Sequence, residues 1–356
     1  MRRPMGGHEL AGELGLNSGT VFRDLNNMAT AKLITRVAEG RKRIYSTNME
    51  TLRNLTRRIL QVVNPDEPDA SPPKGLPHQH GETAPFSAMP QRGIDTPLRR
   101  NYHIEEVFPM TVIEFGKQNQ DTLILLHGGG LSWWNYREAA QKLAEQYHVV
   151  LPVLDGHADS DAPFTTIEEN ANRLISYIDA HFGGQVLLLG GLSLGGQVAV
   201  EMLSQRKNIC RFALIESALV KTMKLTAGLI GPAFGMSYGL IRQRWFAKLQ
   251  ADYLGIPKPL FDDYFRDTCA ICKADMIAFL KANSLYTIQP GLSETTAKVM
   301  IVAGAKEQKN IRDSAKLLRE AIPGSRMEIM PGLRHGDLSI NHPAHYVEIL
   351  TDWIKE

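Results

Sequence analysis

Cysteine and long hydrophobic runs are scarce in this 356-residue sequence. Its three cysteines, Cys210, Cys269 and Cys272, are too few and too late in the chain to form a disulfide framework. No apolar run reaches the roughly 20 residues that a transmembrane helix needs, and Met1-Arg2-Arg3-Pro4 is not followed by the apolar core of a signal peptide. We therefore expect a cytoplasmic protein with reduced thiols and no membrane partner.

Recognisable metal-binding motifs are lacking as well. His78-Gln79-His80 has no third potential ligand nearby. Cys269-Ala270-Ile271-Cys272, which we expect to lie inside a helix, has no second cysteine pair, so core packing explains it better than a metal does. The sequence therefore predicts no metal and no cofactor.

Charge is distributed unevenly along the chain. The formal net charge is +2, but residues 1–60 contain 11 Lys and Arg against five Asp and Glu, so the rest of the chain is acidic. This division suggests two different tasks, and a small basic domain favours a polyanionic partner.

The first sixty residues show the pattern of two short helices followed by a β-hairpin. His8–Leu14 and Ser18–Lys32 have helical apolar spacing, with Gly15 in the turn between them. Residues 33–37 and 42–46 then read as two strands joined by a glycine-containing turn.

This segment resembles the winged helix-turn-helix of ArsR- and MarR-like bacterial regulators. The matching motifs are Glu9-Leu10-Ala11, Leu14-Gly15-Leu16, Gly19-Thr20-Val21 and Gly40-Arg41-Lys42-Arg43-Ile44-Tyr45. The resemblance implies that Ser18–Met28 is a recognition helix for double-stranded DNA and that the hairpin is a wing against its phosphates. The residues implied to contact DNA are Thr20, Arg23, Asn26, Asn27, Arg41, Lys42 and Arg43. The residues alone leave open a small basic domain used for docking or, with Thr51–Val62 as its arm, for homodimer formation.

A proline-rich segment follows this basic domain. Residues 64–100 hold 8 of the 19 prolines, a composition that favours an extended tether. We therefore expect three parts: a winged-helix domain in residues 1–63, a linker in 64–100 and a larger domain in 101–356.

The larger domain alternates short apolar strands with amphipathic helices, which predicts a mostly parallel, eight-stranded sheet covered on both faces. The strands are expected at Ile104–Pro109, Thr111–Phe115, Thr122–Leu126, His148–Leu154, Gln185–Leu189, Phe212–Glu216, Val299–Ala303 and Arg326–Met330. In such sheets the chemistry collects where strands end at their carboxyl edge.

The stretch Gly190-Gly191-Leu192-Ser193-Leu194-Gly195-Gly196 lies between an apolar strand and a helical pattern. A glycine-flanked serine in a strand–turn–helix is the context of a nucleophile elbow. Such a turn is so tight that Ser193 takes strained backbone angles, and side chains at Gly191 or Gly195 would collide with their neighbours. Ser193 is therefore the candidate nucleophile.

Other strand ends carry further potential catalytic groups, and the chain order is serine, acid, histidine. The motifs are His127-Gly128-Gly129-Gly130, Gly156-His157-Ala158-Asp159-Ser160, Gly304-Ala305-Lys306-Glu307 and Gly332-Leu333-Arg334-His335. With the serine motif, they resemble the α/β-hydrolase superfamily over essentially all of residues 102–356. The resemblance implies an α/β-hydrolase fold with a helical lid at about residues 217–292.

The resemblance also implies a catalytic triad. Ser193 would attack a carbonyl carbon, His335 would take its proton, and Glu307 would orient His335. Glu216 is the alternative acid, because some members of the superfamily carry the acid at the end of that strand.

An oxyanion hole follows from the same resemblance. It would consist of the N–H groups of Gly129 and Leu194. We interpret His127 as a residue that braces its own loop and His157 as a turn residue.

The expected lid is rich in apolar side chains, among them Leu225 and Trp245. We expect it to roof the substrate, with Trp133 and Trp134 on the opposite wall. The sequence thus predicts a serine hydrolase, and specifically a carboxylic-ester hydrolase that forms an acyl-enzyme with small apolar substrates. The alternative is a ligand-responsive transcriptional regulator whose hydrolase fold acts mainly as a sensor.

Overall fold

The computed structural model describes residues 5–6, 34–39, 42–47, 110–160 and 162–356. The expected linker and the two expected amino-terminal helices lie outside these ranges. So do five of the residues implied to contact DNA, namely Thr20, Arg23, Asn26, Asn27 and Arg41. The winged helix and the division into three parts therefore stay predictions.

Three strands are described in the first fifty residues. They are β1 (Met5–Gly6), β2 (Ile34–Glu39) and β3 (Lys42–Thr47), and they form an antiparallel sheet in the order β1-β3-β2. Ile34 pairs with Thr47 and Glu39 with Lys42, so Lys42 and Arg43 are the first residues of the second strand of the hairpin. The hairpin expected from residues 33–46 is confirmed.

A seven-stranded sheet forms the centre of the larger domain. Its strands are β4 (Val112–Phe115), β5 (Thr122–Leu126), β6 (His148–Pro152), β7 (Val186–Leu192), β8 (Cys210–Glu216), β9 (Lys298–Gly304) and β10 (Arg326–Met330). The order is β10-β9-β8-β7-β5-β6-β4, parallel throughout except for β4, which pairs antiparallel with β6. The mostly parallel sheet is confirmed, and the strand expected at Ile104–Pro109 lies outside the described residues.

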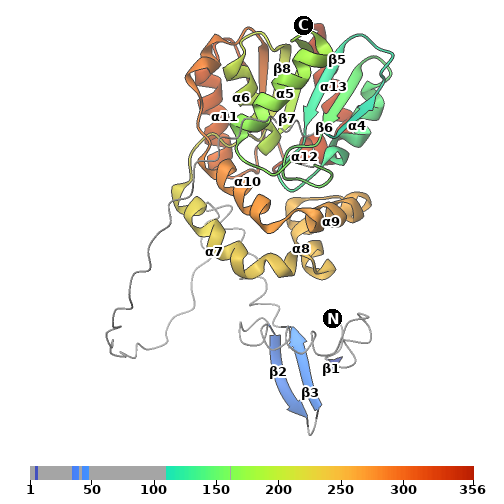
Figure 1. The fold of residues 1–356 in the computed structure, drawn as a ribbon, viewed down its shortest axis with the longest axis vertical. Helices are drawn as coiled ribbons and strands as arrows, with labels where there is room; N and C mark the ends of the chain where they lie inside the picture. Colours follow the sequence, from blue (N-terminus) through green and yellow to red (C-terminus); the bar gives the residue numbers. More distant parts are fainter. Residues whose placement is uncertain (1–4, 7–33, 40–41, 48–109, 161) are drawn as a thin grey trace, which may run out of the picture.

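Helices cover both faces of this sheet (Figure 1). Helices α5 (Ile167–Phe182), α6 (Leu194–Gln205) and α11 (Lys309–Ala321) pack into one hydrophobic core, and α4 (Arg137–Leu143) and α13 (Pro343–Lys355) pack into the other. The central strands are buried on both sides because each face is covered, which accounts for their continuous apolar sequence. Two short elements, η1 (Trp133–Tyr136) and α12 (Asp337–Asn341), follow strand ends at β5 and β10.

Four helices between β8 and β9 form a separate layer, which we call the cap. They are α7 (Lys224–Ile241), α8 (Arg244–Leu254), α9 (Phe261–Ala270) and α10 (Lys273–Leu285), with the short turn η2 (Lys258–Leu260). The short turn η3 (Pro290–Glu294), which precedes β9, packs instead against the end of α6. The four helices lie together at one end of the sheet (Figure 1). The cap occupies the part of the chain in which the sequence predicts a lid.

The prediction of a single helix through Cys269 and Cys272 is wrong. Helix α9 ends at Ala270, and Ile271 is extended, with φ −61° and ψ 127°. Cys272 then caps α10, its Sγ accepting from the Asp275 N–H at 3.4 Å. The helix is interrupted there because Ile271 is buried in the core and the Cys272 thiol caps the next helix. Cys272 is itself exposed and is not packed in a core.

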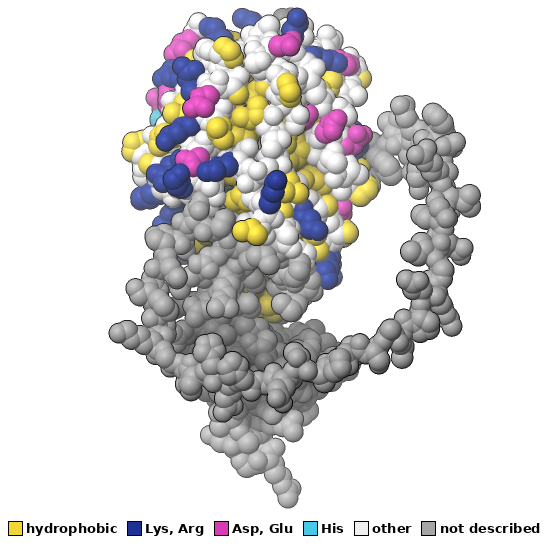
Figure 2. Space-filling model, turned by 90° about the vertical axis from the view of Figure 1, so that its left-hand side faces the viewer, with side chains coloured by type: hydrophobic (Ala, Val, Ile, Leu, Met, Phe, Trp, Pro, Cys, Tyr) yellow, Lys and Arg dark blue, Asp and Glu magenta, His cyan; other side chains and the backbone are white. Residues whose placement is uncertain are grey.

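The surface of the larger domain carries charges of both signs. On the face shown in Figure 2, Lys and Arg side chains alternate with Asp and Glu, with hydrophobic side chains among them. Within the ranges that the structure describes, no helix is both long and apolar enough to cross a membrane.

Candidate active site

Ser193 occupies the turn between strand β7 and helix α6. Its backbone angles are φ 54° and ψ −111°, a positive-φ conformation that is energetically unfavourable for serine. Its N–H donates to the carbonyl oxygen of Glu216 at 2.8 Å, which ties the turn to the end of β8. The strained turn expected from the sequence is confirmed.

The two glycines that flank this turn are required by close packing. A Cβ atom at Gly191 would lie 2.3 Å from the carbonyl oxygen of Gly195, and a Cβ at Gly195 would lie 2.2 Å from that of Leu126. Both obstacles are backbone atoms, which cannot move aside cheaply. The expected collisions with the helix and the neighbouring strand are confirmed.

Glu307 and His335 lie on neighbouring turns that are joined by backbone contacts. The turn after β9 donates to the turn after β10 through Ala305 N–H to the Met330 oxygen at 2.8 Å and Lys306 N–H to the Leu333 oxygen at 2.9 Å. These bonds hold the two turns, and therefore their catalytic candidates, in one fixed arrangement.

The carboxylate of Glu307 is enclosed by hydrogen-bond donors. Its Oε2 lies 2.8 Å from Nδ1 of His335, and its Oε1 accepts from the Gly304 N–H at 2.6 Å and the Ser217 hydroxyl at 2.7 Å. Burial alone would raise the pKa of Glu307, but His335 and the other donors outweigh it, so the pKa lies below its ordinary value. Glu307 is therefore an ionised carboxylate with hydrogen-bond partners on both oxygens.

His335 is the group that this carboxylate controls. Its partial burial would lower its pKa, but the hydrogen bond and negative charge of Glu307 raise the pKa above its ordinary value. Because the ionised Glu307 can only accept, Nδ1 carries the hydrogen, and Nε2 keeps a lone pair. The side chain is 44% exposed, and among the described residues no hydrogen bond joins it to Ser193.

Glu216, the alternative acid, has different surroundings. Its Oε1 accepts from the Ser339 N–H at 3.3 Å, and among the described residues it forms no hydrogen bond with His335. Its side chain is 2% exposed, and this burial raises its pKa to about 7. The structure thus brings Glu307, and not Glu216, into hydrogen-bond contact with His335.

The residues implied to form the oxyanion hole lie next to each other. A Cβ placed on Gly129 would be 3.5 Å from the Cβ of Leu194, the first residue of α6. His127 donates from Nδ1 to the Gly128 carbonyl at 2.9 Å and accepts at Nε2 from the Leu154 N–H at 3.0 Å. His127 therefore braces its own loop, as the sequence predicts.

The expectation that Trp134 lines the substrate wall is wrong. Its side chain is 1% exposed, and its Nε1–H donates to Oδ2 of Asp267 in α9 at 2.7 Å. A buried indole needs a partner for its N–H, and the cap supplies it. Trp133 is partly exposed, with the Arg137 guanidinium 4.8 Å from its ring centre. Leu225, expected in the roof, is 88% exposed.

Sequence reasoning missed Ser217. This residue has φ 57°, and its hydroxyl is one of the donors to Glu307. No motif marks a serine after the sixth strand, because its partner lies 90 residues further along the chain. Its position next to Glu216, at a strand end, is the available signal.

Comparison with known proteins assigns the class. Residues 123–348 match the alpha/beta hydrolase family. An AB hydrolase superfamily protein of Gibberella zeae is 24% identical over 244 residues, covering 66% of this chain and 80% of that protein. The chain belongs to the alpha/beta hydrolase family.

Two further matches are informative. A soluble epoxide hydrolase of a Corynebacterium species is 37% identical over 82 residues, covering 22% of this chain and 27% of that protein. The solved structure of an esterase from Exiguobacterium antarcticum superposes with a TM-score of 0.60 at 19% identity, covering 69% of this chain and 96% of that one. At this identity, the structural match shows a shared fold.

Proposed function

We propose that the protein is a serine hydrolase that cleaves carboxylic esters of small apolar substrates. The observation that carries the proposal is the pairing of a strained, glycine-enclosed Ser193 with a hydrogen bond between buried Glu307 and partly exposed His335 at the same edge of the sheet. A serine hydroxyl needs a base, and the base needs an orienting acid. These residues supply all three roles.

The reaction proceeds in two steps. Ser193 Oγ attacks the ester carbonyl carbon as Nε2 of His335 takes the hydroxyl proton, and the bond to the leaving oxygen then breaks while His335 returns that proton to the alcohol. Water next attacks the acyl-enzyme with His335 again as base, which releases the carboxylic acid and regenerates Ser193. Glu307 stays ionised and stabilises the imidazolium in both steps.

The negative oxygen formed in each step needs hydrogen-bond donors. Leu194 begins α6, so its N–H belongs to the helix end that attracts negative charge, and Gly129 packs against it. A donor of this kind is typically worth about 3 kcal/mol in the transition state.

The identity of the nucleophile argues against epoxide hydrolysis. Epoxide hydrolases of this fold use an aspartate at the elbow, and this chain has Ser193 there. An acyl-enzyme formed on serine hydrolyses readily, whereas an alkylated serine would not. Ester hydrolysis is therefore the better-supported reaction.

A panel of p-nitrophenyl esters of increasing acyl length tests the proposal. We expect turnover of the short esters and its loss in Ser193→Ala, with unchanged thermal unfolding. Absence of turnover by the wild-type protein across the panel would contradict the proposal.

A second candidate function concerns the amino-terminal segment. We propose that it binds double-stranded DNA, either as a head carried by the hydrolase or as the output of a regulator that senses ligands with its hydrolase fold. Its excess of basic residues and the hairpin carrying Lys42 and Arg43 support this. Retardation of the fragment upstream of the gene, weakening steeply as salt rises, is the expected result; absent or salt-independent retardation would leave an interaction or homodimer module.

A further inference from the structure

We propose that His157 is a positioning residue for the oxyanion loop, by which we mean residues 127–130, which carry the proposed donor Gly129; this inference rests on the proposed function. His157 follows strand β6, whereas the loop follows β5, so the contact links two turns of the sheet edge. The N–H of Gly130 donates to Nε2 of His157 at 3.0 Å. Because His157 is 3% exposed, water does not compete effectively for this hydrogen bond.

The hydrogen bonds define which nitrogen of His157 carries its proton. A backbone N–H can only donate, so Nε2 must meet Gly130 with a lone pair. Nδ1 then carries the hydrogen and donates to the carbonyl oxygen of Asp155 at 3.0 Å. His157 is therefore a neutral acceptor directed at the loop, which a residue that merely fills a turn need not be.

His127 and His157 act on opposite sides of Gly129. His127 engages the Gly128 carbonyl, and His157 engages the Gly130 N–H. The two rings contact each other edge to face, with centres 4.9 Å apart. Within the described residues, the Gly129 N–H donates no hydrogen bond, so it is available to an oxyanion.

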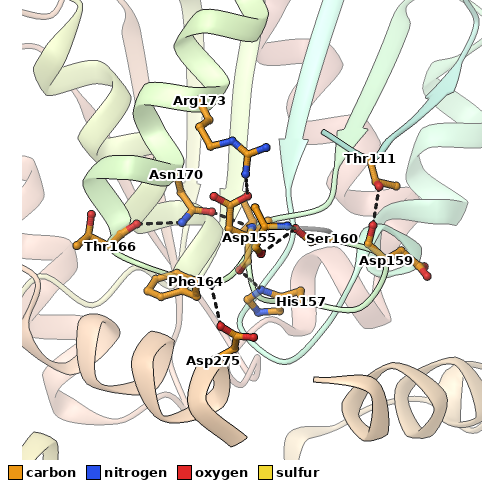
Figure 3. A network of polar contacts seen from close by, with 12 residues as sticks. Thr111, Asp155, His157, Asp159, Ser160, Phe164, Thr166, Asn170, Arg173 and Asp275 are labelled. Atoms are coloured by element: carbon orange, nitrogen blue, oxygen red, sulfur yellow. Dashed lines mark hydrogen bonds and ion pairs between the residues drawn. The ribbon is translucent and has the colours of Figure 1, made fainter. Parts of the chain in front are cut away.

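A network of polar contacts fixes the segment that carries His157 (Figure 3). The N–H of Asp155 donates to Oδ1 of Asn170 at 2.9 Å, and the carboxylate of Asp155 pairs with Arg173. Both partners come from helix α5. The carbonyl to which His157 donates is thereby tied to a long helix.

The cap holds His157 from the other side. Phe279 of α10 stacks on its ring at 4.7 Å with an interplanar angle of 26°, and a Cβ at Gly129 would lie 3.4 Å from Phe279 Cε2. Asp275, also in α10, accepts from the Phe164 N–H at 2.9 Å (Figure 3). One cap helix thus contacts the histidine and the loop that the histidine sets.

Burial keeps His157 neutral, although a negative charge lies nearby. Burial lowers its pKa to about 4, and burial with the adjacent His157 ring lowers that of His127 to about 3. The negative charge of Asp275 acts in the opposite direction and raises the pKa of His157, while the carboxylate of Asp155 is paired with Arg173. Protonation would turn Nε2 into a donor facing the Gly130 donor and would release the loop.

The test compares substitutions that keep or remove the acceptor. In His157→Gln a side-chain oxygen can accept from Gly130, whereas His157→Leu cannot. We expect kcat for a short p-nitrophenyl ester to fall about 10- to 100-fold in His157→Leu with KM little changed, and His157→Gln to recover most of it. His181→Leu and His181→Gln, at an exposed histidine of α5, are the matched controls.

Equal losses in both His157 variants, or losses confined to KM, would overturn the proposal. The tautomer gives a readout that needs no activity and no stable variant. Nitrogen NMR of the ¹⁵N-histidine-labelled wild-type protein should show a His157 ring protonated at Nδ1 and unprotonated at Nε2 until the pH falls to about 4. A ring protonated at Nε2 would overturn the proposal even if the protein proves to have no esterase activity, and that absence alone would contradict only the proposed function.

Discussion

Nδ1 of His335 lies 2.8 Å from Oε2 of Glu307, while Oε1 of the same carboxylate receives the Ser217 hydroxyl at 2.7 Å. Both oxygens of Glu307 therefore have hydrogen-bond partners: Oε2 contacts His335, the proposed base, and Oε1 contacts groups that hold the carboxylate in place. This arrangement separates Glu307 from Glu216, whose carboxylate meets only the Ser339 N–H among the described residues.

Replacing each carboxylate by glutamine shows which of the two acts on His335. Glu307→Gln should reduce kcat/KM for ester hydrolysis by about 10³- to 10⁴-fold, because the imidazolium loses its counter-charge and His335 loses its tautomer preference. Glu216→Gln should reduce it far less. A larger loss in Glu216→Gln would assign the acid to β8 instead.

The pH dependence of the reaction follows from His335. In the proposed mechanism its neutral form is the base, so kcat/KM should fall as the pH drops through its pKa. The raised pKa should place this acid limb above the ordinary 6.5. In Glu307→Gln the limb should move to lower pH, since the stabilising negative charge is gone. An unmoved limb in that variant would indicate that another group titrates.

Removal of the Ser217 hydroxyl tests the support of Glu307. Ser217→Gly keeps the backbone able to adopt φ 57° while deleting the donor, so it is preferable to alanine. Without this donor the pKa of Glu307 should rise toward its ordinary value. We expect kcat to fall about tenfold. The matched comparison is Ser217→Ala, which removes the same hydrogen bond but adds backbone strain at this positive φ. Wild-type kcat in both variants would contradict a role for this hydroxyl.

Stability should depend on pH through Glu216. Its folded pKa of about 7 exceeds the ordinary value of 4.5, so the folded state binds more protons between these values. The free energy of unfolding should therefore decrease as the pH rises from about 4.5 to 7, by on the order of 3 kcal/mol. Urea titrations should show this slope in the wild-type protein and its reduction in Glu216→Gln; identical slopes would contradict the assignment.

The cap should depend on Asp267 for its attachment. Asp267→Ala leaves the buried Trp134 N–H unpaired and should lower the free energy of unfolding by about 2–4 kcal/mol. Asp262→Ala, which removes an exposed carboxylate from the same helix, is the control and should change it by less than about 1 kcal/mol. Equal effects, measured by tryptophan fluorescence in urea, would argue against this anchor.

The parts of the fold that local sequence signals determine could be predicted. Continuous apolar strands indicate a sheet covered on both faces, and a serine enclosed by Gly191 and Gly195 indicates a turn that a Cβ would block. Glu307 and His335 could be proposed because each follows a recognisable strand.

Roles that depend on distant partners could not be predicted. Trp134 anchors the cap through Asp267, 133 residues away, and Ser217 supports Glu307 across 90 residues. The helix break at Ile271 likewise depends on its burial in the core, which outweighs a helical local pattern. Single-sequence patterns carry no information on such contacts.

The reactivity of Ser193 tests the central claim most directly. The wild-type protein should react with a fluorophosphonate, and mass spectrometry should locate the adduct on the peptide that contains Ser193. Ser193→Ala should not react, and Glu307→Gln should react much more slowly. A folded wild-type protein that shows no adduct, or an adduct on a different residue, would contradict a Ser193–His335–Glu307 hydrolase.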